Sequence, residues 1–198
     1  MSANYQIDQD LREALAMVKG LESYLRGTEL YGNAGGGFFS RLPALTVGAL
    51  LMRLRRLDAL HEQLTSAQVS QLQEAQQQHA LIRREWAVHY DEKVLREVKS
   101  RLDAMRTFFK ECADSPKQAP NLYPPEASRR TIAQELVRVL SRDDTYALDK
   151  ELNDKLMATD TRLRQFAKPS PFIWSSQLEP VYPPAEFWWL YAKPPIVN

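Results

Sequence analysis

The sequence predicts an all-α fold, an antiparallel helical bundle of about five helices with one very long helix. Three observations indicate this class. Apolar residues recur at helical spacing through residues 1–167, neither glycine nor proline interrupts residues 66–113, and proline and aromatic residues are concentrated in residues 168–198. We expect this last segment, called the aromatic tail below, to be extended and to pack on the bundle or on a partner.

The first two helices are predicted over residues 7–26 and from Pro43 or Ala44 to Leu64. The spacing of Thr65 and Gln68 matches a capping box, which starts a third helix after a tight turn. The apolar residues of the first helix repeat at alternating spacings of four and three, which places them on one face. They are Ile7, Leu11, Ala14, Val18, Leu21 and Leu25.

The third helix is predicted to run unbroken over about residues 66–113, which is roughly 70 Å at 1.5 Å per residue. Its first part is polar and poorly patterned, so we expect it to project beyond the core. His79 interrupts a run of glutamines there, and we expect it to face solvent. The second part has an apolar stripe with spacings mostly of four, which includes Trp86, Tyr90 and Cys112.

Two shorter helices are predicted over about residues 125–141 and 144–167. The loop DSPKQAPNLYPP precedes the first of them, and proline in a first helical turn favours a start at Pro125. Asp143 or Asp144 is a suitable N-cap for the second helix.

Charge balance, cysteine count and apolar stretches argue against some classes of protein and some cellular locations. Basic and acidic residues number 26 and 25, whereas a dedicated nucleic-acid binder has a basic excess. The single cysteine, Cys112, cannot form an intrachain disulfide, and the first residues do not resemble a signal peptide. The longest apolar stretch, residues 42–52, is too short to cross a membrane. We therefore expect a cytoplasmic protein without a transmembrane segment.

The aromatic tail is the segment most typical of a binding surface. It contains seven of the twelve prolines and three of the four tryptophans. Its large aromatic residues either cover the tail's own bundle or dock on a second copy or a different protein. The predicted partner-binding residues are Phe172, Trp174, Tyr182, Phe187, Trp188, Trp189 and Tyr191.

A glycine-rich loop, residues 32–37, has two interpretations. Its backbone N–H groups could hold a phosphate, but no Lys-Ser or Lys-Thr pair follows it as in a P-loop. The alternative is a linker between helices, and we favour this second interpretation.

Glu85, His89 and Glu92 are spaced four and three apart, so an unbroken helix would place them on one face, as in the metal sites of helical bundles. No Glu-x-x-His motif supplies matching ligands elsewhere. We therefore predict no metal and no cofactor, and a carboxylate–histidine metal enzyme is the least favoured hypothesis.

Basic residues cluster at Arg53, Arg55 and Arg56 and at Arg83 and Arg84. These clusters lack interleaved aromatic residues that could stack on bases, so nucleic-acid binding is only an alternative. The leading hypothesis is a non-enzymatic interaction or scaffold protein, which binds a protein partner or itself through the long helix and the aromatic tail.

Overall fold

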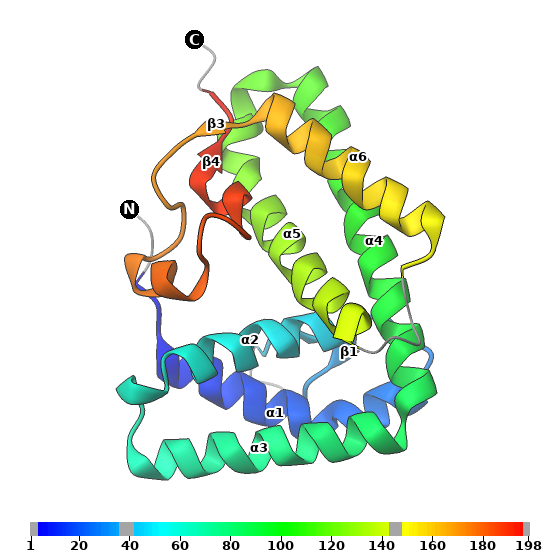
Figure 1. Ribbon diagram of the computed structural model, residues 1–198, viewed down its shortest axis with the longest axis vertical. Coiled ribbons are helices and arrows are strands. Elements are labelled where there is room, and N and C mark those ends of the chain that lie inside the picture. Colours follow the sequence, from blue (N-terminus) through cyan, green and yellow to red (C-terminus); the bar gives the residue numbers. More distant parts are fainter. Residues whose placement is uncertain (1–3, 36–41, 143–147, 196–198) are drawn as a thin grey trace. The chain divides into compact units, whose positions relative to one another are not determined.

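The computed structural model describes residues 4–35, 42–142 and 148–195, and it confirms the all-α fold. Within these ranges the α-helices are α1 (Ile7–Arg26), α2 (Val47–Ala59), α3 (Ser66–Glu85), α4 (Ala87–Asp114), α5 (Ala119–Arg142) and α6 (Lys150–Phe166) (Figure 1). The shorter elements are β1 (Gly32–Asn33), β2 (Ala44–Leu45), η1 (His61–Gln63), η2 (Pro116–Gln118), β3 (Lys168–Pro169), η3 (Ser176–Val181), η4 (Trp188–Tyr191) and β4 (Ala192–Lys193), where η marks a 3₁₀-helix.

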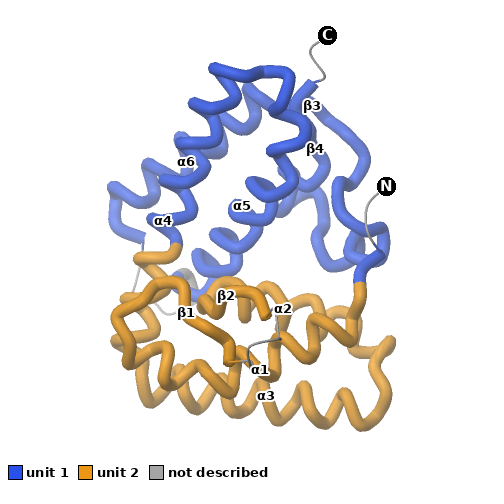
Figure 2. The backbone as a smooth tube through the Cα atoms, turned by 180° about the vertical axis from the view of Figure 1, so that it is seen from behind, with its two compact units in different colours: residues 1–5, 98–198 blue, residues 6–97 orange. Residues whose placement is uncertain are grey.

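The chain forms two compact units (Figure 2). Unit 2 comprises residues 6–97, and unit 1 comprises residues 1–5 and 98–198. The first turns of α4 therefore belong to unit 2 and its remainder to unit 1. Successive helices run antiparallel within unit 2 from α1 to α3 and within unit 1 from α4 to α6 (Figure 1).

The core of unit 2 is organised around α1, which packs against both α2 and α3. The apolar stripe predicted for this helix is confirmed, because every member except the partly exposed Ile7 is buried. The predicted bounds of α1 and the capping box of Thr65 and Gln68 at the start of α3 are confirmed as well.

Two carboxylates of α1 are also buried, and arginines of α2 pair with them. Nε of Arg53 donates to Oε2 of Glu13 at 2.8 Å, and Nη2 of the same guanidinium is 2.6 Å from this oxygen. Nη1 of Arg56 lies 3.3 Å from Oδ2 of Asp10. A charge removed from water needs a hydrogen-bonded counter-charge, so the cluster joins α1 to α2 through groups that are costly to separate.

The bounds of α2 differ from the prediction at both ends. The helix begins at Val47, because Ala44–Leu45 pair as β2 with β1 in a short antiparallel hairpin. The helix ends at Ala59, and η1 follows. His61 is therefore exposed in η1, with Nδ1 lying 2.9 Å from the carbonyl oxygen of Asp58.

The start of α2 is capped twice. The side chain of Thr46 accepts a hydrogen bond from the N–H of Ala49 at 3.1 Å. Glu97 of α4 accepts from the Thr46 hydroxyl at 2.6 Å and from the N–H of Gly48 at 2.9 Å. Glu97 is fully buried, and a carboxylate is favoured at a helix N-terminus because the exposed N–H groups there are positively polarised.

The predicted unbroken helix over residues 66–113 is wrong in one respect: Trp86 divides it into α3 and α4. Trp86 has φ −112° and ψ 31°, which are not α-helical angles, and the chain changes direction there (Figure 1). The first part does not project, because α3 packs on α1. It buries Leu72, Ala75 and Ile82.

A contact between His79 and Tyr90 spans this turn. Nε2 of His79 is 3.0 Å from the hydroxyl oxygen of Tyr90, although the residues are 11 positions apart. In a straight helix they would be separated by roughly 16 Å along the axis, which is more than the two side chains can span. The expectation that His79 faces solvent is therefore wrong. Trp86 itself packs 5.3 Å from the ring of His89 and 5.5 Å from the guanidinium of Arg26.

In unit 1 the buried stripe of α4 continues as predicted to Cys112, whose thiol has a pKa raised by burial and by Glu111. α5 begins at Ala119 and includes Pro124 and Pro125, so the predicted start at residue 125 is too late. Its first turns are anchored by Tyr123, which is completely buried.

α6 begins at Lys150, with the side chain of Asp149 accepting from the N–H of Leu152 at 2.7 Å. The predicted start at residue 144 is therefore too early. The predicted N-caps, Asp143 and Asp144, lie outside the described residues.

The partly buried His79 predicts a pH dependence of stability. Desolvation and the nearby Arg83 lower its pKa from 6.5 to about 4, so the unfolded chain binds one more proton than the folded chain between these values. Stability is therefore full above pH 6.5 and falls as the pH decreases toward 4. We expect His79→Gln to remove about 2–3 kcal/mol of this pH-dependent loss in urea unfolding followed by circular dichroism. The control His61→Gln, at an exposed ring, should keep the wild-type dependence of the unfolding free energy on pH. If His79→Gln kept this dependence as well, His79 would not be its source.

Candidate partner-binding site on the aromatic tail

The aromatic tail folds back on itself. Its first and last described segments, β3 and β4, pair antiparallel with Lys168 opposite Lys193. Two further backbone hydrogen bonds continue this pairing, from the N–H of Ser170 to the carbonyl of Tyr191 and from the N–H of Ile173 to the carbonyl of Leu190, each 2.9 Å long. The prolines prevent a long helix, as predicted, and η3 and η4 are the 3₁₀ turns that remain.

Trp189 fixes the tail to α5. Its indole Nε1–H donates to the hydroxyl oxygen of Thr131 at 2.9 Å, and its carbonyl oxygen accepts from the hydroxyl of Tyr123 at 2.8 Å. Trp189, Thr131 and Tyr123 are almost completely buried, and burial raises the pKa of the Tyr123 hydroxyl. Every polar group of this contact therefore has a partner, which allows the large indole to be buried without cost from an unpaired N–H.

Arg130 joins α5, α6 and the tail. Its guanidinium donates to both carboxylate oxygens of Asp160, at 2.6 and 2.9 Å, and to the side-chain oxygen of Gln134 at 3.1 Å. The same guanidinium lies 4.0 Å from the ring centroid of Trp189. A planar guanidinium suits both roles, because it pairs with a carboxylate through its edge while its face stacks on an aromatic ring.

Three of the seven predicted partner-binding residues are buried inside unit 1, namely Tyr182, Phe187 and Trp189. Their rings contact one another edge to face, with centroids 4.9 and 5.6 Å apart. The remaining four, Phe172, Trp174, Trp188 and Tyr191, are partly exposed. These four can present surface to a partner, so their assignment stays a prediction, whereas the buried three contribute to the core.

A cavity of about 260 Å³ lies where the tail meets the start of α5. Phe172 forms one wall and is supported by Trp174 and Tyr191, at centroid distances of 6.3 and 5.1 Å. Apart from the Ser170 hydroxyl and the Lys193 ammonium group, the lining side chains are apolar or aromatic. The lining residues are Tyr123, Pro124, Ser170, Pro171, Phe172, Ile173 and Lys193.

Neither the wall supplied by α5 nor Lys193 was predicted from the sequence. The repeated Tyr-Pro-Pro at residues 123–125 and 182–184 was an available signal, because both tyrosines prove to be completely buried. Spacing within one segment cannot show that Tyr123 and Lys193 line the same cavity, since they are 70 positions apart.

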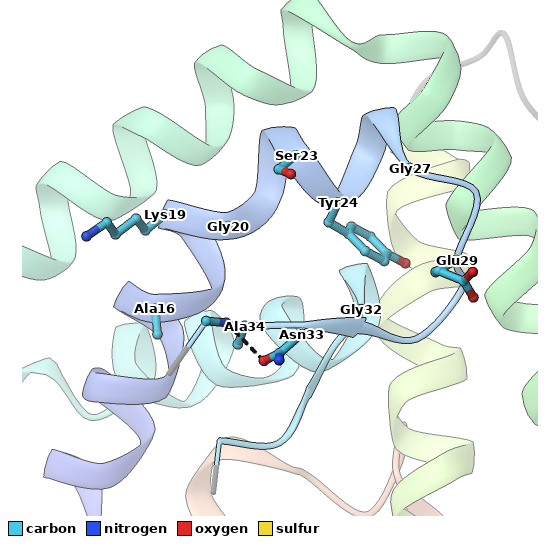
Figure 3. A pocket seen from close by; sticks show the side chains of 11 residues that line it. Ala16, Lys19, Gly20, Ser23, Tyr24, Gly27, Glu29, Gly32, Asn33 and Ala34 are labelled. Carbon is cyan, nitrogen blue, oxygen red and sulfur yellow. Dashed lines mark hydrogen bonds between the residues drawn. The ribbon is translucent and has the colours of Figure 1, made fainter. Parts of the chain in front are cut away.

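The glycine-rich loop, described as far as Gly35, lines a second and larger cavity in unit 2. This open cavity of about 620 Å³ lies between α1 and the loop (Figure 3). Among its described lining residues Lys19 alone is basic, and its side chain extends away from Asn33 and Ala34 (Figure 3). Phosphate binding at this loop stays a prediction, whereas close packing accounts for two glycines that line the cavity.

Gly32 is required because the β1–β2 hairpin approaches α1 closely, and Gly20 lies at the same close approach. A Cβ atom on Gly32 would lie 2.6 Å from the ring of Tyr24, and one on Gly20 would lie 3.1 Å from Leu45. The Tyr24 ring cannot move aside easily, because its hydroxyl donates to the carbonyl of Leu30 at 2.9 Å and the Lys93 ammonium lies 4.4 Å from its centroid.

The structure separates the arginines of the nucleic-acid alternative. Arg53 and Arg56 pair with carboxylates of α1, and the guanidinium of Arg83 lies 5.5 Å from the ring centroid of Tyr90. Arg84 is exposed and Arg55 is partly exposed. The charges of Arg53 and Arg56 are thus already paired within unit 2, and nucleic-acid binding stays an untested prediction.

The residues of the metal hypothesis no longer share one helix. Glu85 is the last residue of α3, whereas His89 and Glu92 belong to α4, so the turn at Trp86 removes the single face on which the hypothesis depended. Within the described ranges no three histidine, cysteine, aspartate or glutamate side chains are placed to hold a metal ion.

Comparisons with known proteins give no family for this chain. No protein-family model matches it, and neither do any curated proteins or solved structures. In the described part of the chain, no helix combines the length and the apolar character that crossing a membrane requires.

Removing the acceptor of the Trp189 indole should destabilise unit 1. In Thr131→Val the shape is kept but the buried N–H loses its partner, so we expect a loss of about 1–3 kcal/mol in the free energy of unfolding. Thr161→Val is the matched control, because Thr161 is exposed on α6 and its hydroxyl donates to the carbonyl of Met157 in the same helix. Equal stabilities of the two variants would refute the role of this hydrogen bond.

A methyl group on Gly32 should disrupt the hairpin packing on α1. We expect Gly32→Ala to lower the free energy of unfolding by about 1–3 kcal/mol, because the added atom overlaps the held ring of Tyr24. In the control Gly27→Ala the new atom meets its nearest neighbours at 3.6 Å, an ordinary contact, and stability should change little. Thermal unfolding of both variants tests this difference, and a Gly32→Ala protein as stable as the control would contradict it.

Proposed function

We propose that this chain is a non-enzymatic interaction protein, and that unit 1 binds a segment of a protein partner at the cavity of the aromatic tail. The main support is the cavity between Phe172, Pro124 and Lys193, because it is apolar inside and basic at its edge. Interfaces are typically formed by buried aromatic anchors with a polar rim, and this arrangement has both.

The cavity is held open by contacts within unit 1. Phe172 packs between Trp174 and Tyr191, while Tyr123 is fixed by its hydrogen bond to the Trp189 carbonyl. A site whose walls are ordered before binding loses little conformational entropy when a ligand enters. An apolar side chain of a partner can therefore fill it at low cost.

Lys193, at the edge of the cavity, and the lysine paired with it define the rest of the ligand. Lys168 and Lys193 are directly opposite each other in the β3–β4 pair, and both are exposed. Like charges at directly opposite positions of an antiparallel pair repel each other. A carboxylate bound between them would relieve this repulsion, so the proposed ligand carries an apolar side chain next to an acidic group.

Deleting the aromatic tail would not test this proposal. Such a deletion removes Tyr182, Phe187 and Trp189 from the core of unit 1, so loss of binding would be indistinguishable from unfolding. Substitutions at exposed positions of the rim leave the core intact and are the appropriate variants.

Selection from a random peptide library against the full-length protein tests the proposal. We expect enriched peptides to share an apolar residue adjacent to an acidic one, since the cavity and the lysines require both. Lys193→Glu should weaken binding of these peptides about tenfold or more, because it replaces attraction by repulsion at the rim.

Lys117→Glu is the control of equal charge change, because this exposed lysine lies in η2, outside the cavity. Absence of any enriched peptide, or equal binding by both variants, would reject the proposal. Native mass spectrometry is a parallel check: a dimer that Lys193→Glu dissociates would identify the partner as a second copy of the chain.

A further inference from the structure

A second surface of unit 1, the groove between α4 and α6, has a concentration of positive charge that the tail cavity does not explain. The groove has a volume of about 140 Å³. Its apolar base includes Leu102 and Phe109, and three basic side chains reach its rim. The lining residues are Leu102, Asp103, Arg106, Phe109, Lys155, Ala158, Thr159 and Arg162.

The basic residues form a row along each helix. Arg106 on α4 follows Lys99 by seven residues, and Arg162 on α6 follows Lys155 by seven residues. Two turns of helix separate the members of each row by roughly 10.5 Å. Lys99 is close enough to act on Glu151, whose pKa is lowered first by its hydrogen bond with Lys155 and also by these charges.

The charges of the groove do not cancel. Its three basic lining residues face one lining carboxylate, Asp103, which leaves an excess of two positive charges, larger than the +1 of the whole chain. Arg162 contributes most directly to this excess. It has no ion-pair partner in residues 4–35, 42–142 and 148–195, and its guanidinium lies 5.2 Å from the ring centroid of Phe109.

The existing ion pairs are of a kind that a ligand can replace. Arg106 lies 3.7 Å from Asp103 three positions away, with 74 % of the arginine side chain exposed. Lys155 is 2.9 Å from Glu151 four positions away, and 75 % of this glutamate side chain is exposed. Exposed pairs within one helix contribute little to stability, so ligand carboxylates can compete for the same cations.

We propose that the groove between α4 and α6 binds an acidic protein segment in which one apolar side chain is flanked by carboxylates. The apolar side chain would enter the groove beside the exposed Ala158 and the aliphatic parts of the basic side chains, and the carboxylates would pair with Arg106, Lys155 and Arg162. The observations favour a peptide over a nucleic acid, because Phe109 is only 5 % exposed and so offers no free ring face for a base.

Fluorescence anisotropy of a labelled peptide, Glu-Glu-Phe-Glu-Glu, titrated with the full-length protein at low salt tests this inference. We expect saturable binding that weakens as salt is raised. Arg162→Glu and Arg106→Glu should each weaken it about tenfold or more, because each reverses a charge at the rim. Arg106→Glu alters a highly exposed side chain, so its effect does not depend on the packing of Arg162 over Phe109.

Arg84→Glu, an exposed arginine on α3 in unit 2, is the matched control and should change the affinity less than about twofold. Three results would overturn the proposal: no binding at about 1 mM protein, equal losses in Arg84→Glu and Arg162→Glu, or equal binding of a peptide with glutamine in place of glutamate. A single-stranded oligonucleotide that binds more tightly than the peptide and depends on Arg162 would overturn it as well. Because the tail cavity is proposed to bind a ligand of similar chemistry, each titration is made in the Lys193→Glu background, in which the tail cavity has lost the basic group at its edge. A loss of binding caused by Arg162→Glu in this background then reports on the groove alone, which separates this inference from the proposed function.

Discussion

The turn at Trp86 is the constraint on which unit 2 depends. It divides an uninterrupted helical sequence into α3, which covers α1, and α4, whose Glu97 caps the start of α2. No glycine or proline causes this turn, so the cause must be tertiary contact. The hydrogen bond between His79 and Tyr90 is geometrically possible only in the bent chain, and it joins the partly buried His79 to the fully buried Tyr90. Since burial keeps His79 neutral at neutral pH, its ring nitrogen can accept the tyrosyl hydrogen.

Each unit also contains a buried arginine whose carboxylate partner comes from another helix. Arg53 pairs with Glu13 between α2 and α1, and Arg130 pairs with Asp160 between α5 and α6. Removing one member of such a pair leaves an unpaired charge out of water, which costs several kcal/mol, so these pairs restrict how the helices can pack. They also explain why clusters of arginine in a sequence are a poor guide to nucleic-acid binding. A charge counted in the sequence is not available to a ligand when a second helix has already neutralised it.

Local patterns predicted what depends on neighbours in sequence. The stripe of α1, its bounds and the capping box of Thr65 follow from spacing and side-chain chemistry alone, and the structure confirms them. The errors concern contacts between distant residues. The turn at Trp86 accompanies the contact of His79 with Tyr90, and the late start of α2 follows from the pairing of β2 with β1. For the candidate site, the sequence identified the aromatic residues but could not show which of them face inward, because proline-rich segments have no periodicity that distinguishes two faces.

The tail cavity and the groove between α4 and α6 are built on one layer of aromatic rings inside unit 1. Phe109, at the base of the groove, and Phe108 both contact the ring of Phe166, with centroids 5.9 and 5.6 Å apart, and Phe108 lies 6.5 Å from the ring of Tyr123 in the wall of the tail cavity. Close-packed rings have few alternative rotamers, so this layer keeps both surfaces in shape without any ligand. The residues that give the surfaces their charge, Lys193 and Arg162, lie outside the layer. Packing and recognition are thus assigned to different side chains, and charge at either surface can change without loss of the core that supports it.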